Sequence, residues 1–209
     1  MRKKPPNKKF LYVISPQVIT NTNKFLYNLR QVLSSEVVSF FQLRIKSNEK
    51  KKIINLAKKI KPITKRYKVK FIINDSPFIT KVSNADGCHL GRGDPSFNFG
   101  RKILGKKKII GATCNNLKHY SKNISKFADY IAYGAFYKTT THKTKYRANI
   151  KLLRWAKKNI KKPIVAIGGI NQSNYKIILE NGADYIAVIS CIWNLKNYSP
   201  LNAVNMFKK

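Results

Sequence analysis

Two aspartates are the first candidates for chemistry, because acidic side chains are rare in this chain. It carries 43 lysines and arginines against 8 aspartates and glutamates. Asp75 closes the apolar run FIIND (71–75), and Asp94 closes CHLGRGD (88–94). Carboxylate oxygens, together with substrate phosphates, are the ligands that Mg²⁺ takes in proteins. We therefore expect Asp75 and Asp94 to hold a metal cation, with a solvated loop end as the alternative for either residue alone.

Basic, hydroxyl and glycine residues suited to phosphate recur in the same kind of position. Arg44 and Lys46 lie at the end of FQLRIK, three threonines occupy 139–141, and Gly168-Gly169 follow another apolar run. Arginine can grip two phosphate oxygens at once. Together with the aspartates, these residues predict a metal-assisted site for a phosphorylated or pyrophosphorylated substrate.

The elements that must position these residues are short apolar runs separated by helical patterns. Most runs are continuous rather than alternating, as expected for strands that are buried on both faces. Amphipathic segments at 49–60, 146–159 and 171–181, and a weaker one at 76–83, lie between them. The eight strand-like runs are 10–15, 38–45, 69–74, 87–90, 108–113, 130–136, 163–167 and 185–190.

The alternation of strands and helices predicts an α/β fold, a single (β/α)₈ TIM barrel over residues 10–209. A doubly wound open sheet is the alternative, although no GxGxxG follows the first run. Ala-Asp precedes a strand at Asp86, Asp129 and Asp184. We interpret these three aspartates as structural turn residues at strand starts.

A barrel gathers the carboxyl ends of its strands on one face, which is the catalytic face of such folds. Nearly all residues at these ends are polar, whereas the strand starts carry lysines and turn residues. This asymmetry favours an enzyme. The polar end residues are Arg44, Lys46, Asn74, Asp75, His89, Asp94, Thr113, 139–141, Gly168, Gly169 and Ser190.

Composition indicates where in the cell the protein is expected. The three cysteines have no CxxC spacing, which is typical of reduced, buried thiols in the cytoplasm. Residues 1–9 are basic and predict a disordered tail, and the apolar run after them is too short for a signal peptide or a membrane span. We therefore expect a cytoplasmic protein with no membrane partner.

The formal charge of +35 raises the question of nucleic acid. Most of the basic residues are lysines spread along the expected helices, whereas base reading and bidentate phosphate contacts favour arginine. Compositional bias is the preferred interpretation, so a nucleic-acid partner is not expected. The positive field should still draw anionic substrates inward.

Several stretches resemble the thiamine-phosphate synthase family in order and spacing, in a form similar to that of alphaproteobacterial members. The resemblance spans about residues 38–193 and is specific as an ordered set, although AIGGI alone is common among phosphate-binding barrels. The stretches are FQLRIK (41–46), FIIND (71–75), ADGCHLGRGD (85–94), IIGATC (109–114), YGAFYKTTTHKT (133–144), AIGGI (166–170) and GADYIAVIS (182–190).

The resemblance implies a transferase of thiamine biosynthesis that joins hydroxymethylpyrimidine pyrophosphate to a thiazole phosphate. Pyrophosphate would leave first, and the thiazole nitrogen would capture the pyrimidine-methyl cation. Such chemistry needs stabilisation of the leaving group's charge more than a general base. The implied cofactor is Mg²⁺, and the implied partners are these small-molecule substrates. A homo-oligomer stays open.

The resemblance also implies a role for each matching residue. Asp75 and Asp94 match the Mg²⁺ ligands. Catalytic roles fall to Arg44, Lys46 and Thr113, and Thr113 stands where the family often has serine. The substrate-binding set comprises Gln42, Arg44, Lys46, Asn74, Thr113, Thr139, Thr141 and His142, with Gly168, Ile189 and Ser190 at the thiazole phosphate.

Four positions depart from the family pattern. His142 replaces the lysine after the threonines, and neutral histidine would lose a charge that the leaving group needs. Ser76 replaces an arginine, Phe78 replaces a polar residue, and Arg92 is added near Asp94. Arg92 could bind phosphate or pair with Asp94, and we favour phosphate.

Two other functions compete with the synthase. One is a thiazole-tautomerase-type paralogue, which would not need the pair Asp75 and Asp94. The other is a non-catalytic protein that binds phosphorylated ligands or RNA. We interpret His89 as a partly buried, hydrogen-bonding histidine rather than a metal ligand or an acid–base group.

Overall fold

The computed structural model describes residues 9–46, 49–139, 147–195 and 197–208, and in this part of the chain the strands form one closed parallel barrel. Strands β1 to β8 pair in sequence order, and β8 pairs with β1. The predicted (β/α)₈ barrel is therefore confirmed, and the open sheet is wrong. The strands are β1 (Leu11–Ile14), β2 (Val38–Leu43), β3 (Lys70–Asn74), β4 (Gly87–Leu90), β5 (Ile109–Asn115), β6 (Tyr130–Tyr133), β7 (Ile164–Ile167) and β8 (Tyr185–Val188).

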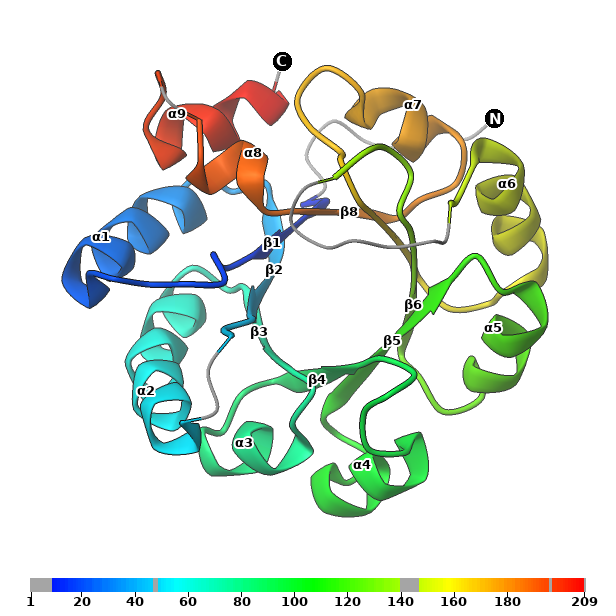
Figure 1. Ribbon diagram of the computed structural model, residues 1–209, viewed down its shortest axis with the longest axis horizontal. Coiled ribbons are helices and arrows are strands. Elements are labelled where there is room, and N and C mark those ends of the chain that lie inside the picture. Colours follow the sequence, from blue (N-terminus) through cyan, green and yellow to red (C-terminus); the bar gives the residue numbers. More distant parts are fainter. Residues whose placement is uncertain (1–8, 47–48, 140–146, 196, 209) are drawn as a thin grey trace.

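Helices surround the barrel as an outer ring (Figure 1). Apolar sides of the helices face inward, as in α1, where Leu29, Val32 and Leu33 are buried. The helices are α1 (Thr22–Leu33), α2 (Lys50–Arg66), α3 (Pro77–Val82), α4 (Phe97–Leu104), α5 (Lys118–Ile124), α6 (Ile150–Asn159), α7 (Tyr175–Glu180), α8 (Ser190–Trp193) and α9 (Pro200–Asn205), followed by a 3₁₀ turn at Met206–Lys208.

The core has two layers because successive side chains of a strand point to opposite faces. In β1, Leu11 and Val13 pack between the strands and the helices, whereas Tyr12 and Ile14 point into the barrel. Both faces are buried, which explains why the strand sequences are continuous apolar runs.

The aspartates of the three Ala-Asp pairs link neighbouring strands at their amino ends. Each carboxylate accepts a hydrogen bond from the backbone N–H at the start of a neighbouring strand and a second one from a basic side chain. Asp86 binds Phe71 N and Lys61, Asp129 binds Ile110 N and Arg101, and Asp184 binds Ile164 N and Lys157. The predicted structural role of these aspartates is confirmed.

Two helices have boundaries that differ from the predicted ones. The segment 171–181 becomes helical only at Tyr175, because the side-chain Oδ1 of Asn171 accepts hydrogen bonds from the backbone N–H and the hydroxyl of Ser173 and holds a turn. The helix predicted at 49–60 continues to Arg66, through Pro62, because Ile63 is also buried.

The predicted disordered tail at 1–9 lies outside the described residues except for its last position. Within the described part, no helix is long and apolar enough to cross a membrane.

Candidate active site

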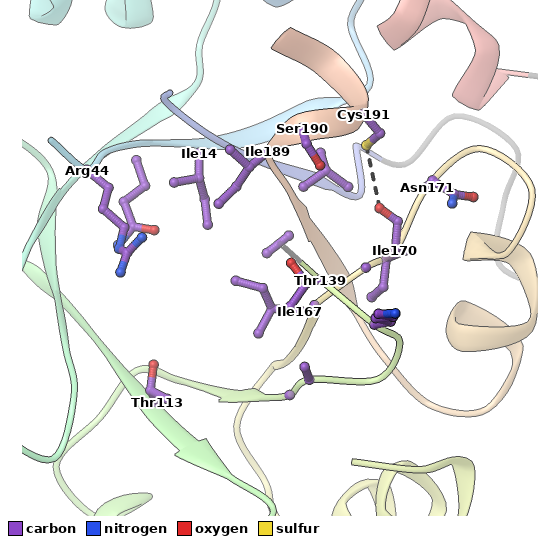
Figure 2. A pocket seen from close by; sticks show the side chains of 18 of the residues that line it. Ile14, Arg44, Thr113, Thr139, Ile167, Ile170, Asn171, Ile189, Ser190 and Cys191 are labelled. Carbon is purple, nitrogen blue, oxygen red and sulfur yellow. Dashed lines mark hydrogen bonds between the residues drawn. The ribbon is translucent and has the colours of Figure 1, made fainter. Parts of the chain in front are cut away.

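A cavity of about 860 Å³ opens at the carboxyl ends of the strands. This volume is in the range of small-molecule sites. Figure 2 shows Arg44 on one side of it and Asn171, Ser190 and Cys191 on the other, with Thr113 at a separate edge. Among the predicted site residues, the cavity is lined by Gln42, Arg44, Asn74, Asp75, Thr113, Thr139, Gly168, Ile189 and Ser190.

Asp75 and Asp94 come together although 19 positions separate them. Asp75 follows β3 in a left-handed conformation, with φ of 62°, and its N–H donates to the His89 carbonyl at 2.8 Å. Asp94 accepts from the Gly91 N–H at 2.6 Å. Burial, reinforced by the nearby Asp94 carboxyl, raises the pKa of Asp75 to about 7. Asp75 therefore lines the cavity with the Asp94 carboxyl beside it, in the smaller adjacent pocket.

Two amides form a fixed recognition edge between β2 and β3. Gln42, which is only 2% exposed, donates from Nε2 to Asn74 Oδ1 at 2.8 Å. Each amide has further hydrogen-bonding groups, so the pair offers both donors and acceptors to a ligand in the cavity.

Arg44 is held by its backbone, which leaves its guanidinium at the cavity wall. Its N–H donates to Ser15 Oγ at 2.9 Å, and the same hydroxyl lies 3.2 Å from the Arg44 carbonyl. Lys46, two residues further, is exposed and is not among the lining residues of the described part. Of the two predicted cationic residues, only Arg44 lines the cavity in the described part of the chain.

The glycine pair after β7 is shaped so that backbone reaches the cavity. Gly168 and Gly169 have φ of 101° and 66°, and a Cβ on Gly168 would lie 2.4 Å from the Ala135 Cβ. Larger residues are therefore excluded at Gly168. Ile189 and Ser190 lie at the start of α8 and line the same cavity, at a position where barrels commonly bind phosphate.

His89 and Thr113 form the polar floor of the cavity. His89 Nε2 and Thr113 Oγ1 are 2.7 Å apart, and His89 Nδ1 lies 2.8 Å from the Tyr130 hydroxyl. Burial lowers the pKa of His89 to about 4, which keeps its ring neutral at physiological pH. The expected hydrogen-bonding role of His89 is confirmed.

The departures from the family pattern have local explanations where they are described. Ser76 caps α3 by accepting from the Ile79 N–H at 3.2 Å, and Phe78 is exposed on the same helix. The Arg92 guanidinium lies 5.8 Å from the centre of the Tyr120 ring and lines both the cavity and a smaller adjacent pocket that contains Asp94.

Some lining residues were missed, and two predicted ones cannot be placed. Lys138 and Asn171 line the cavity, and a cation before the threonines was the available signal for Lys138. Asn171 is the first residue of the segment 171–181 that the sequence predicts to be helical, whereas the structure places it in the loop before α7. Thr141 and His142 lie outside the described residues.

Comparisons with known proteins agree with this geometry. Residues 11–192 match the family model described as thiamine monophosphate synthase. A thiamine-phosphate synthase of Pelagibacter ubique is 49% identical over 209 residues and covers 100% of both chains. One of Clostridium tetani is 38% identical over 168 residues, with 79% of this chain and 80% of the relative covered.

A solved structure from the same family is also similar to this chain. The thiamine phosphate pyrophosphorylase of Pyrococcus furiosus superposes with a TM-score of 0.83 at 28% identity, and the match covers 97% of this chain and 95% of that one. The extent of the family match and the identity of the relatives leave one assignment. The chain belongs to the thiamine monophosphate synthase family.

Proposed function

We propose that the cavity joins hydroxymethylpyrimidine pyrophosphate to thiazole phosphate, releasing pyrophosphate and forming thiamine phosphate. The chain is a transferase of thiamine biosynthesis, and its partners are these small-molecule substrates. The observation that carries the proposal is Asp75 in the wall of the cavity that also contains Gly168 and Gly169, with the Asp94 carboxyl beside it in the adjoining pocket. A tautomerase-type paralogue would use the phosphate loop but would have no need of the carboxylate pair.

The donor set of Asp75 and Asp94 fits Mg²⁺. This cation is usually held by one or two carboxylates together with substrate phosphates, so two aspartates suffice when a pyrophosphate is bound. Burial and the neighbouring Asp94 carboxyl raise the pKa of Asp75, and a divalent cation beside the two carboxyls would favour their ionised forms. When bound, Mg²⁺ neutralises negative charge that develops on the departing pyrophosphate.

The other lining residues divide between the two substrates. Arg44, Asn74 and Thr139 bind the pyrophosphate, and Gln42 with Thr113 contacts the pyrimidine. Gly168, Ile189 and Ser190 hold the thiazole phosphate on the opposite side of the cavity, which leaves the thiazole nitrogen facing the pyrimidine. Lys46, Thr141 and His142 stay predictions from the sequence.

The arrangement favours a dissociative reaction. Arg44 and Asn74 donate hydrogen bonds to oxygens that gain charge as the bond to the pyrimidine methylene breaks. A general base is not required, because the thiazole nitrogen attacks with a lone pair. The neutral ring of His89 adds no positive charge beside the forming cation.

The decisive assay is formation of thiamine phosphate from both substrates, with and without Mg²⁺, by the purified protein. Asp94→Asn removes one carboxylate with little change of shape, and we expect a loss of about 100-fold or more in Mg²⁺-dependent turnover. Glu180→Gln, at the exposed end of α7, is the matched control and should behave like the wild type. No product from the wild type contradicts the synthase, and product without any metal contradicts the Mg²⁺ assignment.

His142→Lys tests the sequence departure at the threonine segment. We expect a higher kcat, because lysine restores a permanent positive charge beside the leaving group. The comparison of kcat for wild type and variant at saturating substrates measures it. An unchanged rate would mean that Lys138, which lines the cavity, already supplies the charge.

We also propose a cytoplasmic location and a single domain over residues 10–209. Cys88, Cys114 and Cys191 are free and buried, as is usual for proteins of reducing compartments. Elements from both ends of the described chain, β1 and β8, pair with each other, as expected for one folding unit.

A further inference from the structure

Four side chains form a continuous chain of hydrogen bonds from the barrel interior to the cavity. The Tyr12 and Tyr130 hydroxyls are 2.7 Å apart, and the Tyr130 hydroxyl lies 2.8 Å from His89 Nδ1. His89 Nε2 then lies 2.7 Å from the Thr113 hydroxyl. Tyr12 and Tyr130 are buried, whereas Thr113 lines the cavity. The barrel core is thus connected to the site by polar contacts alone.

The strand between His89 and Tyr130 is built to permit this chain. His89 on β4 and Tyr130 on β6 both pair in register with Gly111 on β5. A Cβ on Gly111 would lie 1.9 Å from the Tyr130 Cζ, so only glycine lets the tyrosine ring cross β5. The Tyr130 and His89 rings stack with centroids 5.6 Å apart. The geometry is therefore held by backbone register and by ring packing.

The direction of the hydrogen bonds follows from the buried end of the chain. Within the described residues, the only hydrogen-bonding partner of the Tyr12 hydroxyl is Tyr130. A buried hydroxyl proton without an acceptor is costly, so Tyr12 donates to Tyr130. Tyr130 must then donate to His89 Nδ1, which places the ring proton on Nε2. Nε2–H donates to Thr113, whose own proton is left for the cavity.

We propose that Tyr12, Tyr130 and His89 are positioning residues that fix the Thr113 hydroxyl as a hydrogen-bond donor to an acceptor atom of the pyrimidine. The inference rests on the proposed function for the identity of the substrate. No charged side chain takes part in the chain of hydrogen bonds, so it suits a neutral ring nitrogen, while the phosphate oxygens have Arg44.

The tautomer of His89 is measurable without substrate. Nitrogen-15 NMR of the ligand-free protein at neutral pH distinguishes an imidazole protonated at Nε2 from one protonated at Nδ1. The chain has three histidines, so the signal lost in His89→Gln identifies the residue. We expect the Nε2–H tautomer. An Nδ1–H tautomer, or a mixture of the two, overturns the proposed direction.

Kinetics test whether His89 acts through Thr113. His89→Leu removes both hydrogen bonds, and we expect kcat/KM for the pyrimidine pyrophosphate to fall about tenfold or more. The KM for thiazole phosphate and the inhibition by inorganic pyrophosphate should stay as in the wild type. His89→Gln, whose amide can accept from Tyr130 and donate to Thr113, should recover most of the loss. Equal losses in the two variants overturn the positioning role, and weaker pyrophosphate inhibition assigns the contact to phosphate instead.

A double variant separates positioning from general damage. Thr113→Val removes the hydroxyl, and His89→Leu added to it should cause little further loss, because residues that act as one unit are not additive. Losses that multiply overturn the proposal. If the wild type makes no thiamine phosphate, the synthase function fails, and the NMR result still decides the direction of the hydrogen bonds.

Discussion

The surroundings of Asp75 destabilise the ionised form of its own side chain. Its side chain is partly buried, Asp94 lies beside it, and its backbone has a positive φ of 62°. Asparagine tolerates this conformation as well as aspartate does. The cost therefore comes from charge, and a bound divalent cation would remove it.

Asp75→Asn should accordingly raise the melting temperature of the metal-free protein at pH 8 while abolishing Mg²⁺-dependent turnover. The variant removes the repulsion between the two carboxylates and keeps the side-chain shape. Thermal unfolding with and without Mg²⁺ measures both effects. Glu180→Gln, at an exposed position at the end of α7, should leave the melting temperature unchanged. A lower melting temperature for Asp75→Asn would contradict this account of the carboxylate pair.

Among the elements, the aspartates at the strand starts make the same kind of contact three times, a hydrogen bond to the backbone of a neighbouring strand. Asp86 accepts from the Phe71 N–H at 2.8 Å and from Lys61 at 2.7 Å, and so joins β3, α2 and the start of β4. Asp86→Ala leaves the buried Phe71 N–H without this partner, and we expect a loss of about 1–3 kcal/mol in unfolding free energy. Denaturant unfolding measures this loss.

Asp86→Asn is the matched control for that substitution. Its amide oxygen can still accept from Phe71 N–H, and only the ion pair with Lys61 is lost, so the loss of unfolding free energy should be smaller than for Asp86→Ala. Catalysis should be unaffected in both variants when measured below the unfolding transition, because Asp86 lies at the opposite end of the strands from the cavity. Equal losses of stability would show that the ion pair, not the backbone contact, is important.

For the whole molecule, the net charge of +35 should lower the stability of the folded state. Like charges repel more in the compact chain than in the extended one. Sodium chloride screens this repulsion, so the melting temperature should rise between about 0.05 M and 0.5 M salt, where the Debye length falls below about 10 Å. Glycerol at matched osmolality separates screening from exclusion effects. A melting temperature that is independent of salt would contradict self-repulsion.

The sequence by itself determined the barrel and most of the cavity wall. Strand identity depends on local patterns, and all eight runs became strands with boundaries within a few residues, because each run is buried on both faces. Order along the chain then places the strand ends on one face. Residues such as Arg44, Asp75 and Gly168 could be found because each directly follows a strand.

Only the tertiary structure decided which of those residues meet. Asp75 and Asp94 could be paired by chemistry, but Lys46 shares the expected position of Arg44 and yet is exposed and not among the described residues that line the cavity. The contact of Tyr12 with Tyr130 joins residues 118 positions apart, across the barrel interior. Such contacts depend on strand register and on the space above Gly111, which no local pattern encodes. The sequence names the strand ends, and barrel closure determines which side chains act together.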